Sequence, residues 1–199
     1  MHTLKLDKHD KRDLILAKGA AVMMRRGYHG TGVQEIVQAA GIPKGSFYHY
    51  FASKEDFALA ALASIYQPRL QRYAQALSNA DKAPLARILD YYRDLQAYFS
   101  QPQGVQCHCF IGSLSFEMSE AVPAIGEHVA AVLDESVRLL AACLREAQQQ
   151  GALAAEEDCD NLALFIANAW QGVLTRLKVG NDLAPLNAFV LRLERLLQP

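Results

Sequence analysis

The chain has 199 residues, of which 51% are hydrophobic and 21% are charged. This composition supplies enough apolar side chains for a core and excludes an intrinsically disordered chain. The formal net charge of −1 excludes a uniformly basic surface for nucleic acid.

The charge is unevenly distributed along the sequence. Residues 1–55 hold nine Lys or Arg and five Asp or Glu, a net charge of +4, so the remainder carries −5. A basic N-terminal quarter indicates a polyanionic partner at one end of the molecule, although a solvated helix face explains a charge of this size equally well.

The lengths of the apolar segments and the number of cysteines predict the cellular location of the protein. No run approaches the roughly 18 apolar residues of a membrane-spanning helix, and the first residues lack the apolar stretch and cleavage site of a secretory signal. The protein is therefore not expected to have a membrane partner. The four cysteines are few, and a chain this rich in apolar residues does not need disulfides, so a reduced, cytoplasmic setting is predicted.

Ala and Leu dominate the chain, with Gln, Glu and Arg between them, and this pattern predicts an all-α protein of about nine helices. The first helix is expected at 10–26 and the second at 33–40, with Thr31 as its N-cap. A short third helix is expected at 44–50, and Ser53 is the predicted N-cap of a fourth that continues to about residue 76. The remaining helices are predicted at 84–100, 106–118, 122–149, 158–178 and 183–197.

Residues 32–50 have the pattern of a helix-turn-helix, because Gly41 and Pro43 separate two short helical segments. In such a motif the third helix enters the major groove of DNA. Phe47 and Phe51 are expected to point into the core, and the other side chains of this helix are small or polar. An aromatic-rich helical corner with exposed polar tips has the same spacing, so the pattern alone leaves both interpretations open.

The residues in and around this motif closely resemble the N-terminal domain of TetR-family transcriptional repressors. The similarity extends without a gap over about residues 10–65, and the turn, the aromatic run and Ser53-Lys54-Glu55 all fall in register. It implies an all-helical homodimer with an N-terminal DNA-binding domain, here 1–55, and a domain at 56–199 that senses an effector and dimerises. Gly32 departs from the family, which often has a bulkier residue there. The resemblance implies DNA contacts at Thr31, Lys44, Gly45, Ser46, Tyr48, His49, Tyr50 and Lys54.

Two segments of the C-terminal part, 106–117 and 169–178, resemble the NemR-type subgroup, several members of which respond to electrophiles or oxidants through a cysteine. Cys109 matches that cysteine, and Cys107 is an addition in this chain. A position near the start of a predicted helix favours the thiolate of Cys109, and Lys178 lies close to it if the helices pack as in the subgroup. Trp170 belongs to the second segment. These four residues are the predicted effector or sensor residues.

The cysteines also have structural and metal-binding interpretations. A cysteine in a helical protein is most often a small buried hydrophobic residue, and this interpretation is favoured for Cys143 and Cys159. Cys107-His108-Cys109 lacks further metal ligands, and neighbouring side chains on a helix diverge by about 100°. The sequence therefore predicts no metal and no cofactor.

The predicted function is a repressor that leaves a palindromic operator when a small-molecule effector binds or when the sensor cysteine is modified. The alternative is a repressor induced only by reversible binding of a hydrophobic ligand, with structural cysteines. An enzyme is not expected, because no constellation of general acid and base is evident, and a pure scaffold would not need a basic, Tyr-rich third helix.

Two sets of apolar residues are candidates for ligand binding and for dimerisation. Aromatic side chains that could line a ligand pocket, but that are more often plain core, are Tyr91, Tyr92, Tyr98, Phe99, Phe110, Phe116, Phe165 and Trp170. A four-helix interface between two subunits is expected from the last two helices. The residues expected to form it are Leu162, Phe165, Ala169, Val173, Leu186, Phe189, Leu193 and Leu196.

Overall fold

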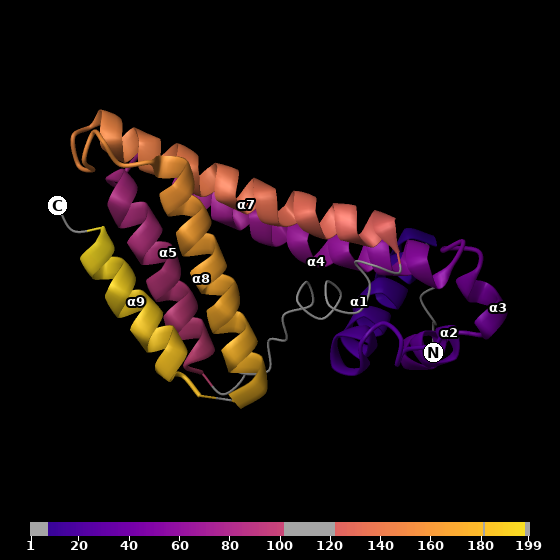
Figure 1. Ribbon diagram of the computed structural model, residues 1–199. Coiled ribbons are helices and arrows are strands. Elements are labelled where there is room, and N and C mark those ends of the chain that lie inside the picture. The colour runs from indigo at the N-terminus through magenta and orange to yellow at the C-terminus, as the bar shows by residue number, and fades with distance from the viewer. Residues whose placement is uncertain (1–7, 102–121, 181, 198–199) are drawn as a thin grey trace. The chain divides into compact units, whose positions relative to one another are not determined.

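The computed structural model in Figure 1 describes residues 8–101, 122–180 and 182–197. All regular structure in these ranges is helical, which confirms the predicted fold class and comes close to the predicted number of helices. No helix among these residues is long and apolar enough to cross a membrane. The predicted helix at 106–118 lies outside the described residues. The helices are α1 (Lys8–Arg26), α2 (Val33–Ala40), α3 (Lys44–Phe47), α4 (Lys54–Leu77), α5 (Pro84–Phe99), α7 (Pro123–Gln149), α8 (Cys159–Gly180) and α9 (Ala184–Leu196).

The described residues form two compact units. The first contains 8–67 and 122–129, and the second contains 68–101, 130–180 and 182–197, so α4 and α7 each contribute to both. The functional division between residues 55 and 56 is a different division of the chain and stays a prediction.

In the first unit, α1 packs on α2 and α2 packs on α3. The side chains of Ile15, Met23 and Ile36 are fully buried between them. Gly19 allows this close approach, because a Cβ atom at this position would lie 2.6 Å from Ile36 Cγ2 and 2.6 Å from Phe57 Cζ. The N-terminal helices are therefore held by a tightly packed apolar core.

The second unit has a larger core built by α4, α5, α7, α8 and α9, and an ion pair lies at its edge. The buried guanidinium of Arg87 donates to both carboxylate oxygens of Glu146, at 2.7 and 3.1 Å. It also donates to the carbonyls of Leu77 and Lys82, at 3.2 and 2.7 Å. Arg87 thus ties α5 to α7 and to the C-terminal end of α4.

Candidate nucleic-acid interface

The turn between α2 and α3 is fixed by backbone hydrogen bonds. Gly41 adopts the left-handed conformation (φ 67°, ψ 32°), which favours glycine, and its N–H donates to the carbonyl of Gln38 at 3.2 Å. The N–H of Ile42 donates to the carbonyl of Val37 at 3.0 Å. Pro43 then precedes the first turn of α3 with an extended backbone. These contacts end α2 and start α3 within a few residues.

Three phenylalanines anchor α3 and the turn that follows it. Phe47, Phe51 and Phe57 are almost completely buried, and their ring centroids lie 5.1 to 5.9 Å apart. The prediction that Phe47 and Phe51 point into the core is confirmed. Because burial of aromatic rings is among the largest apolar contributions in a small core, this cluster determines which side of α3 faces solvent.

Helix α3 ends at Phe47, earlier than predicted. After Phe47 the N–H groups of His49 and Tyr50 donate to carbonyls three residues back, which makes tight turns in place of a further α-helical turn. The N–H of Phe51 then donates to the carbonyl of Phe47, four residues back, at 3.0 Å. The recognition segment, defined here as residues 44–50, is therefore a single helical turn followed by two tight turns.

The outer side of the recognition segment carries the side chains that the sequence singled out. Lys44, Gly45 and His49 are exposed, and the Tyr48 side chain is 56% exposed. A Cβ atom at Gly45 would meet nothing within 4 Å, so this position leaves open space beside the backbone. Ser46 and Tyr50 are partly buried. A polar, hydrogen-bonding surface with one Lys therefore faces solvent.

The predicted N-cap of α2, Thr31, is wrong by one residue. Gly32 is the N-cap, and its N–H donates to the Glu35 carboxylate at 2.5 Å. The Thr31 side chain is fully buried, its hydroxyl donates to the carbonyl of Gly27 at 2.7 Å, and it does not cap α2. The first N–H groups of a helix have no intrahelical partner, and in α2 the leading ones belong to Val33 and to the residue after it.

The start of α4 is capped as predicted. The N–H of Asp56 donates to the Ser53 hydroxyl at 3.0 Å, and the Asp56 carboxylate accepts from the N–H of Ala52 at 2.9 Å. Lys54 is partly buried, and its Nζ donates to the carbonyl of Tyr28 at 3.0 Å. The same nitrogen lies 4.0 Å from the centroid of the Tyr28 ring. Lys54 therefore has partners inside the first unit.

The predicted sensor residues Cys107 and Cys109, and His108 between them, lie outside the described residues. Lys178 is exposed near the C-terminal end of α8. Trp170 is partly buried in the second unit, where its ring contacts those of Tyr92, Phe99 and Phe189 at centroid distances of 5.3 to 6.1 Å.

Cys143 and Cys159 are buried free thiols, which confirms the prediction of a packing role. Burial raises the pKa of Cys143 to about 11, although the nearby Arg87 lowers it, and the thiol donates to the carbonyl of Pro84 at 3.4 Å. Burial also raises the pKa of Cys159. Both thiols are therefore held in the neutral form, which is the weaker nucleophile.

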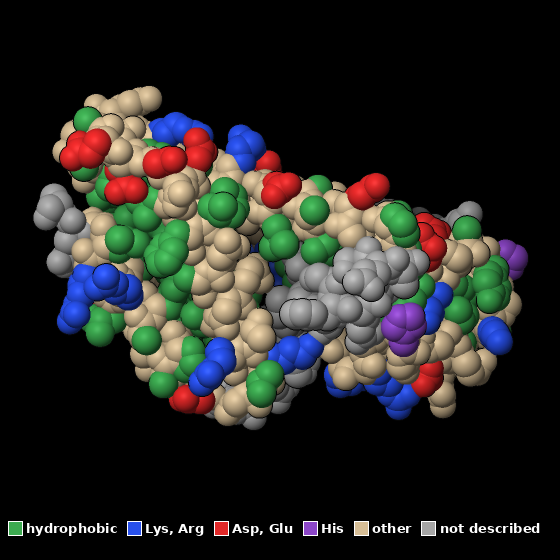
Figure 2. Space-filling view, viewed as in Figure 1, with side chains coloured by type: hydrophobic (Ala, Val, Ile, Leu, Met, Phe, Trp, Pro, Cys, Tyr) green, Lys and Arg blue, Asp and Glu red, His purple; other side chains and the backbone are tan. Residues whose placement is uncertain are grey.

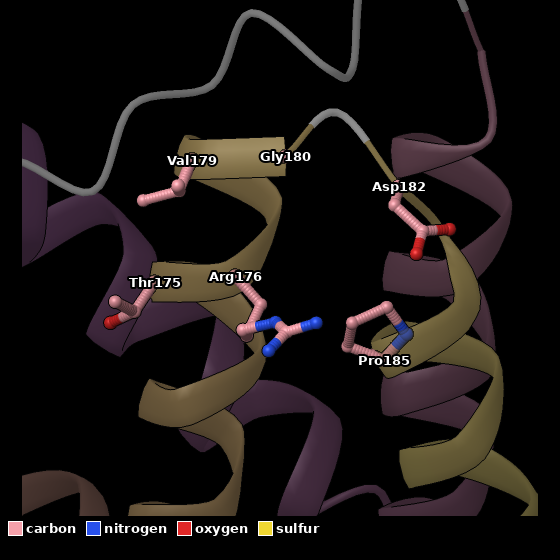
Figure 3. A pocket seen from close by; sticks show the side chains of 6 residues that line it. All are labelled: Thr175, Arg176, Val179, Gly180, Asp182 and Pro185. Atoms are coloured by element: carbon pink, nitrogen blue, oxygen red, sulfur yellow. The ribbon is translucent and has the colours of Figure 1, made fainter.

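The aromatic residues predicted for a pocket do not share one environment. Tyr92 and Phe99 are buried, whereas Tyr98 and Phe165 are 47% and 57% exposed. Phe110 and Phe116 lie outside the described residues. A hollow of about 220 Å³ near the α8–α9 connection contains none of these rings (Figure 3). It is lined by Thr175, Arg176, Val179, Gly180, Asp182 and Pro185.

The residues predicted for a subunit interface also differ in exposure. Leu162, Val173, Leu186 and Leu193 are buried in the core of the second unit, Ala169 and Phe189 are partly buried, and Phe165 and Leu196 are exposed. Figure 2 shows hydrophobic side chains among charged ones over α8 and α9. The large apolar side chains exposed on these two helices are Leu164, Phe165, Val179, Leu191 and Leu196.

Comparison with known proteins gives a consistent match over most of the chain. The family model for bacterial regulatory proteins of the tetR family matches residues 15–61, and the model for the tetracyclin repressor-like C-terminal domain matches residues 84–192. The HTH-type transcriptional repressor DhaR of Mycobacterium sp. (strain GP1) is 31% identical over 179 residues, which cover 90% of this chain and 88% of DhaR. The HTH-type transcriptional repressor NemR of Escherichia coli (strain K12) is 31% identical over 189 residues, which cover 92% and 91%. The crystal structure of the reduced form of E. coli NemR superposes with a TM-score of 0.84 at 29% identity, over 94% of this chain and 97% of that one.

Proposed function

Because the chain belongs to the tetR family of bacterial regulatory proteins, we propose that it is a cytoplasmic repressor that binds a near-palindromic operator as a homodimer. The proposal rests on the recognition segment, whose buried phenylalanines leave Lys44, Tyr48 and His49 facing solvent. Tyrosine hydroxyls, imidazole and ammonium groups are donors suited to phosphates and base edges. Two such segments in one dimer would enter successive major grooves, about 34–36 Å apart.

The proposed DNA contacts are chosen by how far each predicted residue is exposed to solvent. Side-chain contacts are proposed for the exposed or partly exposed residues of the recognition segment, and a backbone contact is proposed at Gly45, where open space allows close approach. The contribution proposed near Thr31 comes from N–H groups at the start of α2, because the Thr31 side chain is buried. The side-chain contacts in this segment are Lys44, Ser46, Tyr48, His49 and Tyr50, and Lys54 at the start of α4 is proposed as a further contact with phosphate.

The dimer is proposed to form through the outward faces of α8 and α9. Phe165 and Leu191 are among the large apolar side chains exposed there, and association would remove them from water. An isologous interface places the same helices of both subunits against each other and gives the twofold symmetry that a palindromic operator needs.

Induction is proposed to act through the C-terminal domain, 56–199. In the first version, modification of Cys109 favours a conformation that fits the operator less well, and Cys107, Lys178 and Trp170 are proposed as further effector or sensor residues. The relative solved in a form described as reduced makes a thiol-dependent state worth testing. In the second version, a hydrophobic molecule binds reversibly and all cysteines are structural. Either event must favour the second conformation by several kcal/mol to work as a switch.

The test is binding of the full-length protein to duplex fragments of its own upstream region at low ionic strength, measured by fluorescence anisotropy. Wild type is expected to bind one fragment with strong salt dependence, and Tyr48→Ala is expected to bind it at least tenfold more weakly. Absence of binding to every fragment would refute the repressor.

A second comparison separates the two versions of induction. N-ethylmaleimide is expected to release the wild type and to leave Cys109→Ser bound, with Cys143→Ser as the control that still releases. Equal release of Cys109→Ser and wild type would reject the cysteine version and leave the repressor standing.

A further inference from the structure

Arg12 of α1 lies against the residue that follows the recognition segment. Its guanidinium carbon is 5.1 Å from the centroid of the Phe51 ring, which is within the range of a cation–π contact. Phe51 comes directly after the recognition segment in sequence and is almost completely buried. A cation from α1 is therefore held beside the part of the first unit that is proposed to bind DNA.

The N–H groups of this guanidinium have no acceptor in the part of the chain that the structure describes. Arg12 is partly exposed, and no hydrogen bond or ion pair of the described residues involves it. Arg26, on the same helix, shows the contrast, because its guanidinium donates to the Glu35 carboxylate. A cation–π contact uses the charge of the group, so the five N–H donors of Arg12 stay available for a further acceptor.

We propose that Arg12 binds a DNA phosphate, from α1 and beside the recognition segment. This inference rests on the proposed function and adds a residue of another helix to the contacts proposed above. Guanidinium groups bind phosphate oxygens through two parallel N–H donors, and a phosphate supplies the acceptor that Arg12 lacks among the described residues. The contact with Phe51 holds the side chain in place before DNA binds, so less side-chain freedom is lost on binding.

The place of Phe51 in the chain puts this contact between two other proposed ones. Tyr50, the last residue of the recognition segment, precedes Phe51, and Lys54 follows it by three residues at the start of α4. Consecutive Cα atoms are 3.8 Å apart, so the Cα atoms of Tyr50 and Lys54 are separated by at most about 15 Å. Arg12, Tyr50 and Lys54 would then contact the same stretch of DNA backbone.

The salt dependence of binding tests the phosphate contact. Each phosphate contact contributes about 0.9 to the slope of log K against log salt concentration, so loss of one contact per subunit of a dimer lowers the slope by about 1.8. The full-length wild type and Arg12→Met are compared on the upstream fragment that wild type binds. Lys18→Met is the matched control, because Lys18 is an exposed cation about 9 Å further along α1.

We expect Arg12→Met to bind at least fivefold more weakly at low salt, with a slope lower by about 1.8, and Lys18→Met to keep the wild-type slope. A wild-type slope in Arg12→Met would overturn the proposal. An equal fall of the slope in both variants would show a general effect of charge and would overturn it as well.

The dependence on DNA sequence separates a phosphate contact from support of the recognition segment. A phosphate contact carries no sequence information, so Arg12→Met is expected to weaken binding to the operator and to an unrelated duplex by the same factor. If Arg12 acted only by positioning the recognition segment, the loss would be confined to the operator, as is expected for Tyr48→Ala. That result would also overturn the proposal.

Two further variants separate loss of the contact from loss of the fold. Arg12→Lys keeps the charge, so it is expected to retain the wild-type slope while binding more weakly than arginine, and a slope lowered by about 1.8 would contradict the proposal. Arg12→Gln removes the charge and is expected to lower the slope as Arg12→Met does, so it replaces that variant if the methionine protein does not fold. If wild type binds no duplex, the proposed function fails together with this contact. If wild type binds and both neutral variants keep its slope, only the role of Arg12 is rejected.

Discussion

Gly19→Ala is expected to destabilise the first unit although alanine is the better helix former. The new Cβ would lie 2.6 Å from Ile36 Cγ2, 2.6 Å from Phe57 Cζ and 3.2 Å from Phe57 Cε2. Carbon atoms at rest in a protein core lie about 3.5–4.0 Å apart, so both neighbours must move. Neither has room, because both are fully buried and the ring of Phe57 packs against Phe47 and Phe51.

The size of the effect follows from two opposed contributions. Overpacking a close-packed core costs about 1–3 kcal/mol, and a clash with two different helices favours the upper end of that range. Replacing Gly by Ala within a helix stabilises the folded state by about 0.8–1.0 kcal/mol. The net expectation for Gly19→Ala is a loss of about 2 kcal/mol, which corresponds to a melting temperature lower by about 4–8 °C in a chain of this length.

Thermal unfolding followed by circular dichroism, at one protein concentration, measures this difference. Ala17→Gly is the matched control, because Ala17 is exposed on the same helix and reports the helix-propensity contribution alone, with a loss of about 1 kcal/mol. A Gly19→Ala protein as stable as wild type, or more stable, would show that the contact of α1 with Ile36 and Phe57 is loose and would refute the packing argument.

Two further predictions concern the second unit. Arg87→Met is expected to cost about 2–3 kcal/mol in urea unfolding, because it removes the guanidinium that donates to Glu146 and to two carbonyls. Glu146 reaches solvent, which keeps the loss below that of a fully buried pair, and a loss under about 1 kcal/mol would contradict this prediction. The pKa of Cys143 is raised to about 11, so its protonated form stabilises the folded state below about pH 9 and this contribution is lost as the pH rises toward 11. Urea unfolding from pH 8 to 11 is therefore expected to fall less steeply in Cys143→Ala than in wild type, and parallel curves would exclude the effect.

Helix positions could be read from the sequence because local signals were strong. Gly41 and Pro43 mark a break that only a few backbone conformations satisfy, and Ser53 with Asp56 forms a cap whose partners lie within four residues. The periodic apolar residues of α2 gave its bounds without error. Such signals depend on neighbours in the sequence, so they need no knowledge of the tertiary structure.

Where tertiary contacts decide, the sequence was less informative. Thr31 is a good N-cap residue by type, but its side chain is fully buried in the first unit, and Gly32 with the Glu35 carboxylate serves as the cap instead. The partners of Lys54 lie 26 residues away in sequence, which no local pattern reveals. In each case a polar group had several suitable partners, and packing chose among them.

The interface prediction failed in part for a related reason. Helices α8 and α9 are apolar around much of their circumference. The spacing of their apolar residues therefore does not show which side of each helix faces the core of the second unit. Leu162 and Val173 face inward, and Phe165 faces outward. The core of α5 and α7 decides this, and its position follows only from the assembled unit.

In residues 44–51, the buried rings and the outward polar groups have different roles. The rings maintain the fold, and the polar groups are those proposed to select the DNA sequence. Phe47 and Phe51 maintain the backbone path, whereas Tyr48 and His49 contribute little to the core. If the recognition segment binds DNA as proposed, substitutions at the outward positions change the bound sequence without repacking the interior. A change at either phenylalanine would instead disturb the backbone that presents all of the outward groups.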